Sequence, residues 1–86
     1  MKFLIKNYVD KLSKNDINTF LINNDIHLDE NELSFSYNFI KENWDKIVSS
    51  PNMVNLDSYK THFKEENYLK ICNLYKTYYT KYHRYL

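Results

Sequence analysis

The 86-residue chain contains no glycine, alanine or glutamine, and only one proline and one cysteine. Hairpin turns of types I′ and II′ need residues with positive φ, most often glycine, so its absence disfavours β-hairpins. No stretch alternates strictly between apolar and polar residues over the length of a strand. These absences point away from a β-rich fold.

Cys72 is the single cysteine, which excludes an intrachain disulfide and gives no reason to expect an oxidising compartment. The apolar run near the N-terminus, Phe3-Leu4-Ile5, is shorter than the roughly 7–15 residues of a signal peptide. No apolar run approaches the roughly 20 residues needed to span a bilayer. We therefore expect a cytoplasmic protein with no membrane partner.

The net charge is small, because 12 basic and 11 acidic residues nearly cancel and leave a net charge of +1. This predicts no strong global field for nucleic acid or an anionic membrane. With 43% hydrophobic residues, the chain has enough apolar side chains for one core. We expect a single helical domain over residues 1–86. Abundant Asn, Lys, Ile and Tyr also indicate an AT-rich genome, which raises the tyrosine count without selection for binding.

Apolar residues recur at helical spacing in the first half of the chain. One segment is expected over about residues 3–12. Ser13 and Asp16 then form a potential capping box for a second segment, which Asn23 and Asn24 end by adopting the left-handed conformation. Asp29 and Glu32 form a second capping box for a longer helix, which ends at Ser49-Ser50-Pro51-Asn52.

The apolar stripe breaks near residues 64–66, where Glu66, Asn67 and Lys70 occupy positions that would continue it. We read a short helix near residues 55–64 and a longer one near 66–84, with one kinked helix as the alternative. The fold class is thus all-α, a small bundle of four or five short helices. The predicted core is Leu4, Tyr8, Val9, Leu12, Ile17, Phe20, Leu21, Leu33, Tyr37, Ile40, Trp44, Ile47, Ile71, Cys72 and Tyr75.

Residues that could carry catalysis or bind a metal are few. No glycine-rich phosphate loop or nucleophile elbow is present. Cys72, His27, His62 and His83 lack the spacing of metal ligands. A chain of this size is also expected to lack room for a deep pocket, which typically needs about 300 Å³ or more. We therefore expect no enzyme, no catalytic residue, no metal and no cofactor.

The C-terminal stretch interleaves tyrosines with cations. On a helix, the tyrosines fall in one wide apolar sector and most of the cations fall opposite it. This favours a non-catalytic interaction module that binds a protein partner, or itself, through Tyr78, Tyr82 and Tyr85. The alternative is RNA or single-stranded nucleic acid, stacked on tyrosines and neutralised by Lys76, Lys81 and Arg84; it is possible but not favoured.

The order of elements in about the first 50 residues resembles a family of short, uncharacterised helical proteins from low-GC Gram-positive bacteria. The resemblance implies an all-α fold and a bacterial cytoplasmic setting, and it transfers no activity or site. It rests on Phe3-Leu4-Ile5, Tyr8-Val9, Asn15-Asp16-Ile17, Phe20-Leu21, Asn24-Asp25-Ile26-His27-Leu28-Asp29 and Phe39-Ile40.

Overall fold

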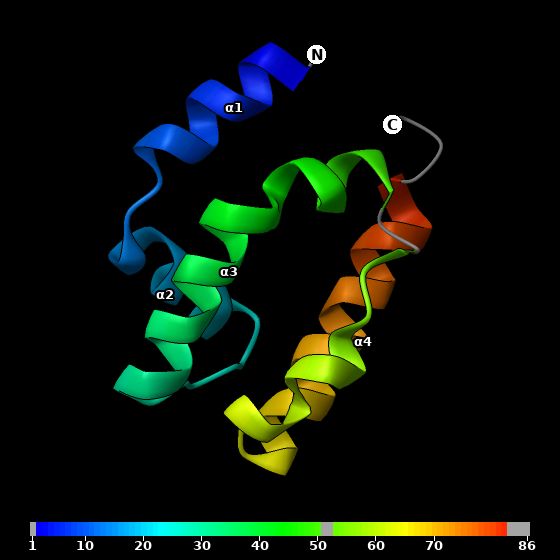
Figure 1. Ribbon diagram of the computed structural model, residues 1–86. Coiled ribbons are helices and arrows are strands. Elements are labelled where there is room, and N and C mark those ends of the chain that lie inside the picture. The colour runs from blue at the N-terminus through cyan, green and yellow to red at the C-terminus, as the bar shows by residue number, and fades with distance from the viewer. Residues whose placement is uncertain (1, 51–52, 83–86) are drawn as a thin grey trace.

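The computed structural model describes the backbone of residues 2–50 and 53–82, and their side chains except at 2, 3, 79, 81 and 82. Every regular element in these ranges is helical, which confirms the all-α fold (Figure 1). The chain forms α1 (Lys2–Lys11), α2 (Lys14–Asn23), α3 (Glu30–Ser49), the 3₁₀ helix η2 (Leu56–His62) and α4 (Glu65–Tyr82). Helices α1 and α2 pack on α3, and η2 packs between α3 and α4.

Both predicted capping boxes are present. The Ser13 hydroxyl accepts from the Asp16 backbone N–H at 3.0 Å, and the Asp16 carboxylate accepts from the Ser13 N–H at 2.9 Å. Asp29 and Glu32 exchange the same pair of bonds, at 2.8 and 3.0 Å. Because each box satisfies N–H groups that the first helical turn leaves unpaired, α2 and α3 begin where the sequence predicted.

The end of α2 differs from the prediction. The left-handed residue is Asp25, with φ of 61°, rather than Asn23 or Asn24. The Ile26 N–H donates to the Leu21 carbonyl at 2.8 Å, and the Asp25 N–H donates to the Ile22 carbonyl at 3.0 Å. This is the Schellman pattern, which brings the residue after the left-handed one against the last turn of the helix. Ile26 is therefore the most deeply buried apolar side chain described, 1% exposed.

The main core cluster consists of Ile17, Leu21, Ile26 and Leu33, contributed by α2, its C-terminal loop and α3. Val9 is also buried. Other predicted core residues are half-buried: Leu12, Tyr37, Ile40, Trp44, Ile47, Ile71, Cys72 and Tyr75.

The prediction of burial is wrong for three residues: Leu4, Tyr8 and Phe20 are exposed by 65%, 68% and 44%. Among the larger contacts between described elements, α1 packs on α3 alone, and the buried Val9 lies on the covered face of α1. Leu4 and Tyr8 lie on a neighbouring face of α1, and the described residues cover this face less than they cover the Val9 face.

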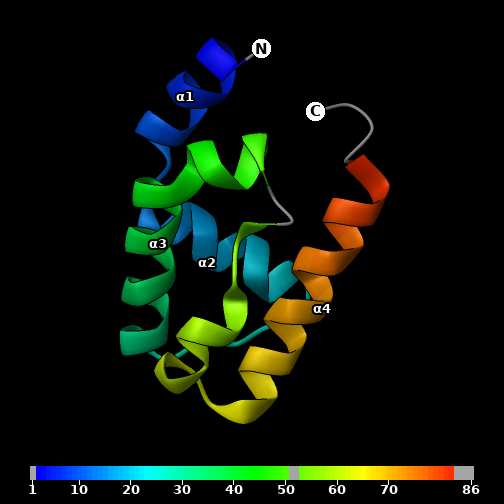
Figure 2. The ribbon, with the colours of Figure 1, turned by 45° about the vertical axis from the view of Figure 1, so that its right-hand side comes forward.

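The junction at residues 63–64 separates two helices, so the kinked-helix alternative is wrong. Phe63 is extended, with φ of −132° and ψ of 151°, and the chain reverses direction there (Figure 2). The Tyr68 hydroxyl donates to the Asp57 carboxylate at 3.1 Å, which ties α4 back to η2. The predicted end of the last helix near residue 84 lies outside the described residues.

Candidate functional site

An apolar cavity of about 420 Å³ lies between the helices. Its size overturns the expectation that so short a chain lacks room for a pocket, because ligand pockets start at about 300 Å³. The lining is nearly all aliphatic and aromatic; Asp16 carries its one charge among the described residues and Ser36 adds a hydroxyl. The walls include Leu12, Ile17, Phe20, Leu21, Phe35, Phe39, Ile40, Ile47, Leu56, Tyr59, Phe63, Ile71, Leu74 and Tyr75.

Helix α3 lines the cavity along much of its length. Helix α3 bends part-way, so that its C-terminal half turns toward the side of the molecule where α4 ends (Figures 1 and 2). At Asn43 the side-chain amide donates to the Phe39 carbonyl at 2.9 Å, and side-chain bonds of this kind accompany bends in helices. The cavity is lined by apolar side chains from α1, α2, α3, η2 and α4.

Three exposed aromatic rings contribute to the lining of the cavity. Tyr8 on α1, Phe20 on α2 and Tyr78 on α4 line the cavity and are exposed by 68%, 44% and 40%. The Phe20 and Tyr78 rings meet edge to face, with centroids 5.9 Å apart. Leu4 lies one turn before Tyr8 on the same face of α1. We refer to Leu4, Tyr8, Phe20 and Tyr78 as the apolar mouth.

The opposite wall is an aromatic cluster that holds η2 against α3. Phe35 stacks on His62 with centroids 4.0 Å apart and meets Phe63 edge to face at 5.6 Å. Phe39 meets Tyr59 edge to face at 4.8 Å. Such pairs add about 0.5–1.5 kcal/mol each beyond the area they bury. These ring contacts tie η2 and the residue after it to α3.

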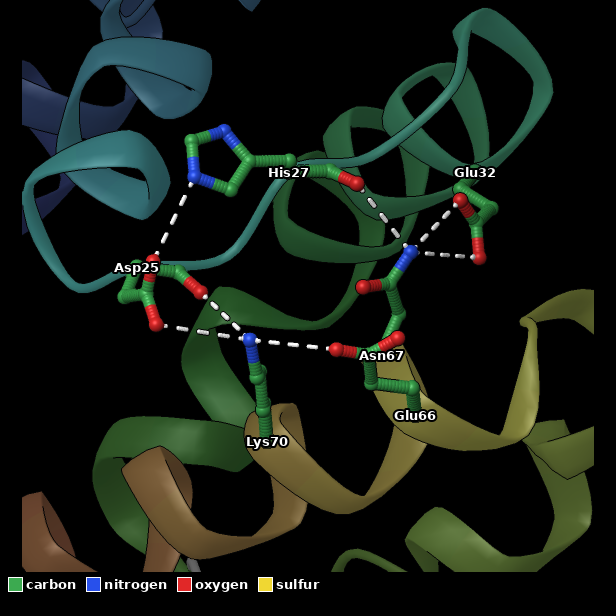
Figure 3. A network of polar contacts seen from close by, with 6 residues as sticks. All are labelled: Asp25, His27, Glu32, Glu66, Asn67 and Lys70. Atoms are coloured by element: carbon green, nitrogen blue, oxygen red, sulfur yellow. Dashed lines mark hydrogen bonds and ion pairs between the residues drawn. The ribbon is translucent and has the colours of Figure 1, made fainter.

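A buried polar cluster fixes the start of α4 and therefore the position of Tyr78. The Glu32 carboxylate, 2% exposed, accepts from the Lys64 backbone N–H at 2.8 Å and from the Asn67 amide at 3.0 and 3.2 Å (Figure 3). The Asn67 amide also donates to the His27 carbonyl at 3.2 Å. Glu32 thus lies between the N-terminal turns of α3 and α4, where both helix dipoles favour negative charge.

Lys70 makes a second link between α4 and the loop after α2. Its amino group donates to the Asp25 carbonyl at 3.0 Å and pairs with the carboxylates of Asp25 and Glu66, each at 3.5 Å (Figure 3). His27 lies 3.5 Å from the other Asp25 oxygen. These groups are exposed, so each pair contributes little energy. Lys70 does, however, bond the carbonyl of the strained Asp25 directly.

Two carboxyl groups near the cavity and α2 have lowered pKa values. The backbone N–H and then the hydroxyl of Ser13 lower the pKa of Asp16 below its usual 3.8. A hydrogen bond from Lys14 lowers the pKa of Glu30 below its usual 4.5. Tyr68, on α4, has a raised pKa because of the neighbouring Cys72 thiol, burial and Asp57. Asp16 therefore brings a negative charge to an otherwise apolar wall at neutral pH.

The structure describes only part of the predicted interaction surface. Tyr78 is exposed and lies at the apolar mouth. The side chain of Tyr82 and all of Tyr85 lie outside the described residues. Of the predicted nucleic-acid residues, Lys76 is exposed on α4, while the side chain of Lys81 and all of Arg84 lie outside the described part.

Sequence reasoning missed Tyr8 and Phe20 as site residues, because their helical spacing assigned them to the core. It also missed the burial of Asn67, although the break in the apolar stripe at this residue was the available signal. In the described ranges, no three His, Cys, Asp or Glu side chains gather where they could hold a metal ion. Nor does any helix there have the length and apolar character to cross a membrane.

No protein-family description, curated protein or solved structure matches the chain. The resemblance to short helical proteins of low-GC Gram-positive bacteria therefore stays a prediction. What the chain does must be inferred from its own cavity and surface.

Proposed function

We propose that the protein is a non-catalytic interaction module that binds a protein chain through the apolar mouth. The observation that carries the proposal is an apolar cavity of about 420 Å³ whose lining includes three exposed aromatic rings. The proposal keeps Tyr78 from the predicted surface and adds Tyr8 and Phe20. Tyr82 and Tyr85 remain predicted members of the same surface, and a cytoplasmic location remains the predicted setting.

The physical reason is that the mouth combines the two features of a binding hot spot. Large, rather rigid rings contribute much apolar area, and a neighbouring hollow lets a partner side chain leave water completely. An amphipathic helix laid across such a hollow anchors through residues spaced three and four apart. A carboxylate such as Asp16 at the wall then favours a polar or basic group beside those anchors.

The test is affinity capture of the tagged full chain from its native cell, with nuclease and at high salt, compared across two matched variants. Tyr8→Ser removes an exposed ring from the mouth. Leu69→Ser removes an exposed apolar side chain, 58% exposed, from a part of α4 that does not line the cavity. We expect a stoichiometric partner that Tyr8→Ser loses and Leu69→Ser retains. Equal capture by both variants would refute the assignment of the mouth.

Nucleic-acid binding through Lys76, Lys81 and Arg84 is the alternative and remains a prediction. Lys76 and Tyr78 are two residues apart on α4, so they point about 160° apart. Stacking with charge support needs a ring and a cation on one surface, and this pair does not provide it. Phosphate contacts weaken steeply with salt, whereas apolar contacts persist. Capture that nuclease or high salt abolishes would therefore favour the alternative.

A further inference from the structure

We propose that helix α1 is a gate on the cavity, and that the amino group of Lys41 holds this gate closed. As a means of regulating the site, the inference rests on the proposed function, because Leu4 and Tyr8 of the apolar mouth lie on α1. Release of α1 from α3 would take both residues away from the mouth and open the cavity on this side.

Helix α1 has few attachments to the rest of the fold. It lies at one edge of the molecule (Figure 1), and among the larger contacts between described elements it packs on α3 alone. Val9 is its one buried side chain among those described, whereas Leu4 and Tyr8 are exposed. Helices α2 and α3, by contrast, supply three of the four residues of the core cluster. Less apolar burial therefore holds α1 in place than holds either of the two helices after it.

The sequence of α1 gives it little helical stability of its own. It has ten residues, and isolated helices shorter than about 12–15 residues are marginal in water. Of the charged residues in its terminal turns, Lys2 and Asp10 lie at the ends where the helix dipole disfavours them, and only Lys11 is placed favourably. Helix α1 thus depends on α3 to stay helical. Weakly attached elements of this kind open at a lower free energy than the core.

Lys41 of α3 makes the polar attachment at the C-terminal end of α1. Its amino group donates to the Val9 carbonyl at 2.6 Å and to the Asp10 carbonyl at 3.2 Å. Both carbonyls are among the last four of α1, which the regular pattern of an α-helix leaves unpaired, and a cation is favoured at this end of the dipole. The amino group also lies 5.4 Å from the centroid of the Tyr37 ring, one turn earlier on α3. Lys41 therefore joins the last turn of α1 to α3.

The same end of α1 forms part of the cavity wall. Tyr8 on α1 and Leu12 just after it both line the cavity, and Leu12 packs against the core cluster. When α1 leaves α3, the Tyr8 ring leaves the wall and more of the apolar lining meets water. A partner that binds the open cavity more tightly than the closed one would shift the balance toward the released state of α1.

The test is native-state hydrogen exchange of the full chain, followed by NMR at low urea concentrations. We expect the amides of residues 6–12 to exchange through one common opening, at least about tenfold more populated than the opening that exchanges the α2 amides. Lys41→Met keeps an apolar side chain and removes the ammonium group. It should speed exchange in α1 by about tenfold or more, because hydrogen bonds to a charged donor are lost. Lys46→Met, at an exposed lysine of the same helix, should leave exchange in α1 unchanged.

A second measurement tests whether release of α1 uncovers the cavity. The dye anilinonaphthalene sulfonate becomes fluorescent on exposed apolar surface. Lys41→Met should therefore bind more dye than Lys46→Met or the wild type. The α2 amides should stay as protected in Lys41→Met as in the wild type, which separates release of α1 from unfolding of the whole domain.

Equal protection of α1 and α2 in the wild type would overturn the inference. So would a gradient along α1 that leaves the amides of residues 9–12 as protected as those of α2, because this is simple fraying. Unchanged exchange in Lys41→Met, or faster exchange with no added dye binding, would overturn it as well. A failed gate leaves the interaction module standing, since none of these results concerns capture of a partner. A gate that opens as expected, while Tyr8→Ser and Leu69→Ser capture the same proteins, removes the module alone.

Discussion

Replacing Glu32 by Gln should destabilise the fold far more than any nearby glutamate replacement. The carboxylate accepts at both oxygens: one from the Asp29 N–H and the Asn67 amide, the other chiefly from the Lys64 N–H. Glutamine keeps the shape but turns one acceptor into an NH₂ group. In its better orientation this group faces the Lys64 N–H, so two donors meet at a site that is 2% exposed.

The size of the effect follows from the bonds lost. One charge-assisted hydrogen bond contributes about 1.5–3 kcal/mol, and the others weaken when the charge is removed. We expect a loss of about 3 kcal/mol in the free energy of unfolding. The whole domain has about 4–13 kcal/mol for its 86 residues. For a domain of this size the melting temperature should fall by about 12–24 °C.

Thermal unfolding followed by far-ultraviolet circular dichroism measures the change, with urea unfolding as a second probe. The matched control is Glu30→Gln, two residues earlier on the same helix. The Glu30 side chain is 74% exposed and pairs with Lys14. The melting temperature of the Glu30→Gln variant should therefore stay close to that of the wild type. If Glu32→Gln also stays within about 0.5 kcal/mol of the wild type, the buried cluster does not hold α4 in place.

Two further predictions concern the loop after α2 and acid stability. Ile26→Ala should cost about 2–5 kcal/mol in urea unfolding, because the 1% exposed side chain joins the Schellman turn to the core; a loss below about 1 kcal/mol would contradict this. Asp16 and Glu30 have lowered pKa values when folded, so their contribution is present above the usual 3.8 and 4.5 and is lost as the pH falls through the folded values. NMR titration of both carboxyl groups should show these low pKa values, and Ser13→Ala should raise that of Asp16 alone.

The sequence by itself determined the helices of this protein. A capping box joins residues only three apart, and the apolar pattern of a helix can be read within one segment. Ser13 and Asp29 therefore mark the starts of α2 and α3 without any tertiary information. The break in the apolar stripe likewise separated η2 from α4. The sequence predicted the C-terminus of α2 to within a residue or two. The left-handed conformation was predicted at the wrong residue, because Asn and Asp both tolerate that conformation.

Only the tertiary structure decided which apolar faces are covered. Helical spacing places Leu4 and Tyr8 on the apolar stripe of α1 and Phe20 on that of α2, but burial depends on what packs against each stripe. Here α1 packs on α3 through the side that carries Val9, and an apolar cavity lies beside the buried core. The second role of Glu32 is equally non-local, since its partner Asn67 is 35 residues away. Capping is a local interaction that the chain carries in its order of residues, whereas a cavity and its mouth exist only once separate helices have packed.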